Sequence, residues 1–135
     1  MECMATSDNV IRAGLTPKLR DVPNLVSSLT YEAADAGKHS VKAAQFESCP
    51  YTRVYDPPVQ EFSVLYTEVG SGVGEVHRGL EGPSITIVTG GSCQIEWLGG
   101  ELEARTGEVF FVAAETGLKI VGSEENTEVF RAFVE

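Results

Sequence analysis

The chain has 135 residues, of which 42% are hydrophobic and 22% are charged. These values fit one compact globular domain, and no apolar run reaches the roughly 20 residues that a membrane helix needs. Twenty acidic residues against ten basic ones give a formal net charge of -10. Because this charge repels a phosphate backbone, we expect no nucleic acid partner, and the lack of a long apolar run predicts no membrane partner.

The basic residues are unevenly distributed. Arg12, Lys18 and Arg20 lie close together near the start, whereas most carboxylates follow residue 55. A local cationic region in an acidic protein suits a small anion better than a charged polymer. This distribution indicates where an anionic substrate would bind.

Three cysteines at wide spacing, Cys3, Cys49 and Cys93, argue against a disulfide framework or a cysteine zinc site. We expect buried free thiols. The first residues include Glu2 and Asp8 and lack the apolar core of a targeting peptide, which predicts a cytoplasmic protein.

The first half of the sequence predicts little regular structure. Residues 1 to 15 alternate loosely around a turn-forming Ser-Asp-Asn cluster, which predicts two short extended pieces. After Asp21, apolar residues with helical spacing predict a helix of two to three turns that ends near Tyr31. The polar, Ala-rich stretch 32–48 predicts a connector.

From Tyr51 onwards, short β-type runs alternate with glycines. These runs are Phe62 to Val69, Ser84 to Thr89, Ser92 to Trp97, Glu108 to Val112, Leu118 to Val121 and Glu128 to Val134. Regular short strands separated by turn signals are typical of a sandwich or barrel. The sequence therefore predicts a mainly β protein, an antiparallel jelly roll with a short N-terminal helix. The glycine-rich stretch 70–74 lacks the Gly-Lys-Ser/Thr ending of a phosphate loop, and we expect a hairpin loop there.

His39 and His77 are the only two histidines. A catalytic zinc ion needs about three protein ligands that converge on one point, and two separated histidines do not provide them. We expect both histidines to be surface residues. Trp97 is interpreted as a core or interface residue, with a sugar-stacking platform as the alternative.

The run Glu2-Cys3-Met4-Ala5, followed by Ser7-Asp8-Asn9-Val10-Ile11-Arg12-Ala13-Gly14-Leu15-Thr16-Pro17-Lys18, closely resembles a family signature. It occurs near the end of the catalytic domain of type I mannose-6-phosphate isomerases. Residues 21–25 continue the match, and residues 55–62 resemble the strand entry of that family's C-terminal domain. The resemblance implies a zinc-dependent cytosolic isomerase that interconverts mannose 6-phosphate and fructose 6-phosphate.

The resemblance also implies a domain organisation. Residues 1–20 would form the end of a cupin-type catalytic domain, with the trailing strands of that jelly roll, and residues 21–50 a helix and connector. Residues 51–135 would form a cupin-like, metal-free C-terminal jelly roll. The family's zinc ligands, a Gln, two His and a Glu, would all lie upstream of Met1, which we interpret as an internal methionine. We therefore expect the chain alone to bind no zinc and to be inactive without a missing N-terminal part of the same protein.

The resemblance assigns four candidate site residues. Arg12 takes the place of the catalytic arginine, whose guanidinium can stabilise the enediolate formed during isomerisation. Glu2 is the second catalytic candidate, as a carboxylate that orients the arginine or moves a hydroxyl proton. Lys18 and Asp8 are substrate-binding candidates, with Lys18 as a point charge for phosphate. The alternatives are a solvated loop lysine and an aspartate that caps a turn.

A second interpretation is a free-standing, metal-free cupin-like binding or interaction module, because jelly rolls carry many unrelated functions. The structure of residues 1–18 discriminates between the two. Strands without partners would indicate one piece of a larger sheet. Closure of this segment on residues 51–135 would favour the independent module.

Overall fold

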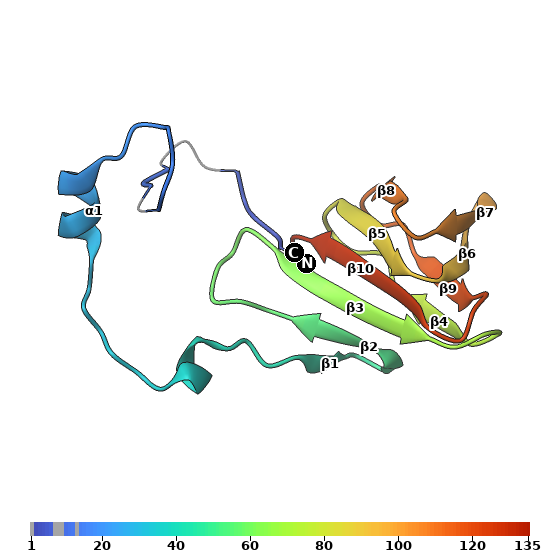
Figure 1. The fold of residues 1–135 in the computed structure, drawn as a ribbon. Helices are drawn as coiled ribbons and strands as arrows, with labels where there is room; N and C mark the ends of the chain where they lie inside the picture. Colours follow the sequence, from blue (N-terminus) through green and yellow to red (C-terminus); the bar gives the residue numbers. More distant parts are fainter. Residues whose placement is uncertain (1, 7–9, 13) are drawn as a thin grey trace. The chain divides into compact units, whose positions relative to one another are not determined.

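The structure is a computed structural model that describes residues 2–6, 10–12 and 14–135. The chain divides into two compact units, Met1–Ser40 and Val41–Glu135. The first unit contains the helix α1 (Val22–Ser28) and the 3-10 helix η1 (Ala36–His39), both visible in Figure 1. The described residues before Asp21 form no strand, so the expected trailing strands of a preceding jelly roll are not formed there. A strand needs hydrogen-bonding neighbours, and the described part of this unit supplies none.

Helix α1 begins where the sequence predicts. The Asp21 side chain accepts a hydrogen bond from the backbone N–H of Asn24 at 3.2 Å, and a proline lies in the first turn. The helix ends at Ser28, earlier than expected. The hydroxyls of Ser27 and Ser28 donate back to the Asn24 carbonyl oxygen at 2.9 and 2.7 Å, and Leu29 is already extended. Such side-chain bonds to the backbone are a common feature of helix ends.

The second unit is built from two antiparallel sheets (Figure 1). The larger sheet has the order β1-β2-β3-β10-β5-β8, with strands Ala44–Phe46, Cys49–Tyr55, Ser63–Val69, Thr127–Phe133, Ser84–Gly90 and Val109–Val112. The smaller sheet has the order β4-β9-β6-β7, with strands Gly74–His77, Leu118–Gly122, Ser92–Trp97 and Gly100–Arg105. The prediction of a mainly β, antiparallel jelly roll with one short N-terminal helix is confirmed.

Four strands, β1, β2, β4 and β7, were not among the predicted runs. Strand β1 lies in the stretch that the sequence presents as a connector, and β2 begins directly after it. β1 pairs with β2, and β2 pairs with β3. Their few apolar residues gave no alternating pattern, and pairing with neighbouring strands outweighs local preference. The prediction of a hairpin loop at 70–74 was wrong, because this segment joins β3 of the larger sheet to β4 of the smaller one.

The core lies between the two sheets. Its main cluster contains Val69, Val88, Cys93, Ile95, Ala104, Val112, Leu118, Ile120 and Val129. A smaller cluster, with Phe46, Cys49, Leu65, Leu80 and Phe133, fills the end near β1 and β2. The thiols of Cys49 and Cys93 are buried and free, as predicted, while Cys3 is half-buried. Burial raises the pKa of the Cys93 thiol to about 11, which keeps it unreactive at neutral pH.

The outer face of the larger sheet carries two rows of mostly apolar side chains. Each row contains one side chain from each of the five neighbouring strands β2, β3, β10, β5 and β8. The first row is Tyr55, Val64, Ala132, Ile85 and Phe111, and the second is Arg53, Tyr66, Phe130, Ile87 and Val109. Phe111 is 74% exposed and Val109 is 57% exposed. An exposed apolar face of this extent is typical of a surface that another part of a protein covers.

Gly122, at the end of β9, is expected to be intolerant of any side chain. Its backbone exchanges hydrogen bonds with the loop after β3, at 2.8 Å to Gly72 and 3.0 Å to Val73, and a Cβ there would collide with the Gly70 carbonyl oxygen. We expect Gly122→Ala to lower the free energy of unfolding by about 2 kcal/mol, as overpacking does. Gly74→Ala is the control, because its Cβ would meet atoms only at 3.5 Å or beyond. Urea unfolding of both variants measures the difference, and equal stabilities would contradict it.

Candidate functional site

The four sequence-predicted site residues lie in the first unit. Glu2 and Lys18 are exposed and Arg12 is half-buried, whereas Asp8 lies outside the described residues. The backbone N–H of Lys18 donates to the Thr16 hydroxyl at 3.2 Å, which turns the chain at this point. The structure records no hydrogen bond or ion pair that joins Glu2, Arg12 and Lys18 among the described residues. Their roles therefore remain predictions.

The same segment exposes apolar side chains to solvent. Leu15 is fully exposed, Leu19 is 89% exposed and Met4 is 78% exposed. A segment that places cations beside exposed leucines has a surface suited to packing against further protein. The described part of the segment thus carries candidate polar groups that other side chains do not enclose in a pocket.

A second group of polar side chains is buried inside the jelly roll of the second unit. The Nε2 atom of His77 lies 2.9 Å from the Thr52 hydroxyl and 3.3 Å from the Thr67 hydroxyl. Glu75, on the same strand, accepts from the backbone N–H of Tyr51 at 2.6 Å and from the Thr52 hydroxyl at 3.4 Å. These bonds tie β2, β3 and β4 together across the gap between the sheets.

The expectation that both histidines are surface residues was wrong for His77, which is 1% exposed, and right for His39. In β4 the side chains of Glu75 and His77 point inward, while Val76 points outward and is 63% exposed. This inverts the usual pattern, in which the apolar side chain of a strand points into the core. Burial first, and then the charge of Arg131, lower the pKa of His77 to about 4, so its ring is neutral at neutral pH.

Arg131 is the largest fully buried side chain and was not identified from the sequence. Its Nε donates to the Ser84 hydroxyl at 2.8 Å, whereas Nη1 and Nη2 have no hydrogen-bond partner among the described residues. Burial and the charge of Arg78 lower the pKa of Arg131 to about 10, so it stays charged at neutral pH. The alternation Val129, Arg131, Phe133 was the available signal, because two apolar neighbours with a period of two place the arginine on the core face.

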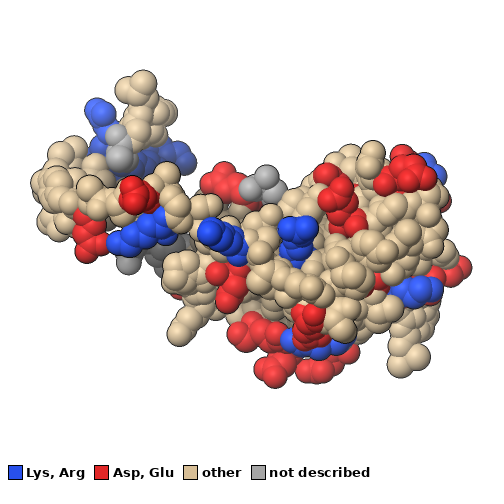
Figure 2. Space-filling model, turned by 90° about the horizontal axis from the view of Figure 1, so that it is seen from below, with Lys and Arg blue, Asp and Glu red and all other residues tan. Residues whose placement is uncertain are grey.

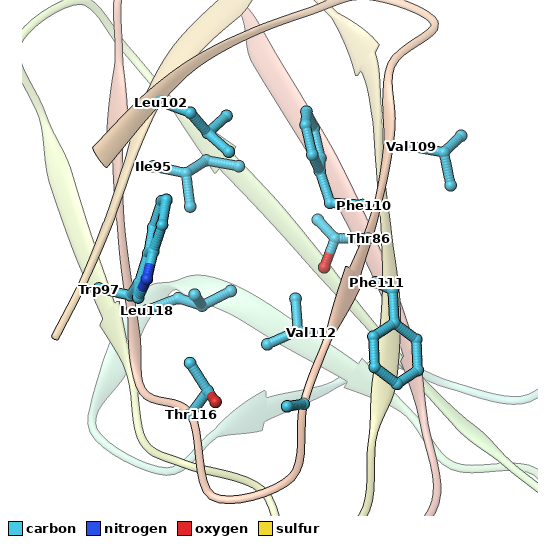
Figure 3. A pocket seen from close by; sticks show the side chains of 11 residues that line it. Thr86, Ile95, Trp97, Leu102, Val109, Phe110, Phe111, Val112, Thr116 and Leu118 are labelled. Carbon is cyan, nitrogen blue, oxygen red and sulfur yellow. The ribbon is translucent and has the colours of Figure 1, made fainter. Parts of the chain in front are cut away.

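A pocket of about 500 Å³ opens between the two sheets (Figure 3). Trp97, Ile95, Leu102 and Leu118 come from the smaller sheet and its edge. Phe110, Val112 and Thr86 lie opposite them on β8 and β5. Trp97 is 37% exposed and lines this pocket, so it is neither fully in the core nor on a flat surface.

The residues that the structure describes do not fit a zinc ion. They contain no group of three or more His, Cys, Asp or Glu side chains that could hold a metal. Around His77 the neighbouring groups are the threonine hydroxyls and a positively charged guanidinium, which disfavours a cation.

The surface of the second unit is acidic. On the face drawn in Figure 2, acidic side chains form groups with single basic side chains between them. The second unit also carries an ion network in which Arg78 binds Glu47 at 2.6 Å and Glu135 at 2.7 Å. Within the described chain, neither helix has the length and apolar character needed to cross a membrane.

Comparison with known proteins shows which proteins the chain is similar to. Residues 54–100 match a family model described as phosphomannose isomerase type I C-terminal. The whole chain is 47% identical to the mannose-6-phosphate isomerase of Cryptococcus neoformans and covers 31% of that protein. It is 42% identical to the mannose-6-phosphate isomerase of Saccharomyces cerevisiae, of which it covers 32%. The chain therefore spans about a third of the length of these relatives.

The fold agrees with solved structures of the same kind. The apo form of mannose 6-phosphate isomerase from Salmonella typhimurium superposes with a TM-score of 0.80 at 26% identity. The alignment covers 98% of this chain and 32% of the bacterial one. The same values hold for the Salmonella enzyme bound to fructose 6-phosphate and zinc. The chain is thus similar over its full length to about a third of these mannose-6-phosphate isomerases, and its residues 54–100 match the C-terminal domain of the type I family.

Proposed function

We propose that this chain is the C-terminal part of a cytoplasmic, zinc-dependent isomerase that interconverts mannose 6-phosphate and fructose 6-phosphate. The observation that carries the proposal is the 47% identity to the Cryptococcus neoformans enzyme over the full length of this chain. This alignment includes the segment around Arg12. When bound, zinc polarises the sugar oxygens, and we assign its ligands to the part of the relatives that this chain does not match.

We assign the chemistry of this chain to its first segment. Moving a proton between C1 and C2 of the sugar develops negative charge on oxygen, and the Arg12 guanidinium stabilises that charge. Glu2 orients the guanidinium or exchanges a hydroxyl proton. Lys18 attracts the sugar phosphate, and Asp8 contributes to substrate binding.

We further propose that residues 1–20 complete the catalytic domain, residues 21–50 form the helix and connector, and residues 51–135 form the C-terminal jelly roll. Two observations support a covering partner of the same protein. The apolar side chains of the first segment are exposed, and the outer face of the larger sheet is apolar. Contact with the N-terminal part of the same protein would remove both apolar surfaces from water, which is favourable.

The proposal is tested by joining the upstream two thirds of the Cryptococcus neoformans enzyme to this chain. We expect the fusion, supplied with zinc, to convert mannose 6-phosphate to fructose 6-phosphate, and the 135-residue chain alone to give no turnover above background. The upstream part alone is the control and should also be inactive. Turnover by the isolated chain, or a folded zinc-loaded fusion without turnover, would overturn the assignment.

One observation favours the free-standing binding module as a second candidate. The second unit has its own core, and its strands pair with one another in two sheets that enclose a pocket. Such a unit can fold and bind without the rest of an enzyme. The fusion experiment separates the two functions, because a pure binding module would leave the fusion inactive.

A further inference from the structure

The inter-sheet pocket has a lining unlike that of a sugar site. Nine of the eleven residues around it are apolar, although the side chains of Val109 and Phe111 lie on the outer face, and the two polar residues, Thr86 and Thr116, are threonines. A sugar phosphate carries a hydrogen-bonding group on almost every carbon, and burying such groups against Val, Leu and Phe leaves them unsatisfied. The pocket instead fits a ligand whose body is an aromatic ring or a short alkyl chain.

The hydroxyl of Thr86 is a polar group within this apolar lining. Its side chain is fully buried, it lines the pocket between Phe110 and Val112, and its hydroxyl makes no hydrogen bond within the described residues (Figure 3). A buried hydroxyl without a partner costs free energy, which a ligand acceptor at hydrogen-bond distance would recover. The pocket therefore favours a ligand that ends in a hydrogen-bond acceptor.

The charge behind Thr86 determines which acceptor is favoured. Arg131 is not itself a lining residue, but it is paired with Thr86 across β10 and β5. Its Nε donates to the hydroxyl of Ser84, which pairs with the pocket residue Val112. The two outer guanidinium nitrogens lack a hydrogen-bond partner in the described part of the chain. The nearby carboxylate of Glu135 is already bound by both Nη atoms of Arg78. A buried positive charge in this state attracts an anion more strongly than a neutral group.

We propose that the inter-sheet pocket binds a small organic monocarboxylate, with its aryl or alkyl body between the sheets and its carboxylate directed at Thr86, where the positive charge of Arg131 on the neighbouring strand favours an anion. The apolar walls select the body, and the hydroxyl and the buried guanidinium select the charge. This site is separate from the sugar-phosphate chemistry assigned to the first segment. It makes the second unit a ligand-binding domain in its own right.

The single tryptophan of the chain makes the site measurable. Trp97 lines the pocket, so its fluorescence reports occupancy directly. We would titrate the 135-residue chain with 4-phenylbutyrate and, separately, with the neutral 4-phenyl-1-butanol. We expect saturable binding of both, with the acid at least roughly tenfold tighter, as a hydrogen bond to a charged group provides.

Three variants test the polar end of the pocket. Thr86→Val keeps the shape and removes the hydroxyl, and Arg131→Met removes the charge, so each should bring the acid and the alcohol to similar affinity. Thr89→Val, on the same strand but facing outward, is the matched control and should preserve the preference. If Arg131→Met does not fold, Thr86→Val alone decides.

Four outcomes of the titrations would overturn the proposal, and a fifth comes from the oligomeric state. They are equal affinity of the chain for acid and alcohol, a fluorescence change that does not saturate, an acid preference that survives in Thr86→Val, and displacement of the acid by mannose 6-phosphate. A dimer of this chain that covers Trp97 and excludes both probes would also overturn it. That last result is read by analytical ultracentrifugation, in parallel with the titrations.

Discussion

Arg12→Ala in the active fusion is expected to lower kcat/KM by at least about a hundredfold. The proposed role of the guanidinium is to stabilise charge that exists only on the way to the enediolate, and loss of one such group commonly costs a factor of about 100 to 1,000. The effect should fall mainly on kcat, since the interaction is absent in the ground state. Steady-state kinetics with mannose 6-phosphate measure it.

Two further variants sharpen this test. Arg20→Ala removes another cation near the same segment and should change kcat/KM by less than about threefold. Arg12→Lys keeps the charge and loses the planar, two-pronged donor geometry, so we expect partial activity. Zinc content and circular dichroism should match the unmodified fusion in every case. Unchanged kinetics in Arg12→Ala would remove Arg12 from the proposed machinery.

Acid is expected to destabilise the second unit through His77, beginning well above the range in which carboxylates titrate. The pKa of His77 is about 4 in the folded chain and about 6.5 in an unfolded one. Above pH 6.5 the ring is neutral in both states. As pH falls from 6.5 to 4, the unfolded chain binds a proton that the folded chain excludes, because the ring is buried beside Arg131. The free energy of unfolding should therefore fall by about 3 kcal/mol over this range.

The measurement is urea unfolding at pH values between 7 and 4. His77→Gln retains hydrogen-bonding groups near Thr52 and removes the titrating ring. Between pH 6.5 and pH 4, the free energy of unfolding of this variant should therefore fall by about 3 kcal/mol less than that of the unmodified chain. His39→Gln, at the exposed histidine, should behave like the unmodified chain. The difference between variants cancels the contribution of carboxyls such as Glu135, whose pKa is lowered by Arg78. Parallel pH profiles for all three proteins would refute this role of His77.

The success of the sequence-based fold prediction varied with the local pattern. Strands β5 and β6 were placed within one residue because their apolar residues alternate between glycine turns. Strands β1, β2 and β4 were missed because they carry few apolar residues on their core faces. Thr52, Glu75 and His77 occupy those positions instead, and polar groups enter a core only where other strands supply hydrogen bonds.

One of the two candidate sites could be found from the sequence, and the other could be found only from the structure. The segment around Arg12 was found from a continuous motif, which needs no tertiary contact to be recognised. The pocket near Thr86 could not be found this way, because its lining comes from five strands, β5 to β9, that the fold distributes over two different sheets. Only the pairing of β10 with β5 brings the arginine beside the threonine.

The sequence by itself determined the family resemblance, the antiparallel β class and the start of the helix at Asp21. Each of these depends on residues close together in the chain, as motif, alternation or cap. Only the tertiary structure decided that His77 and Arg131 are buried, how the sheets are ordered and where a pocket opens. These features depend on which distant strands become neighbours, and an inward-facing side chain acquires its protonation state and its partners only when those strands meet.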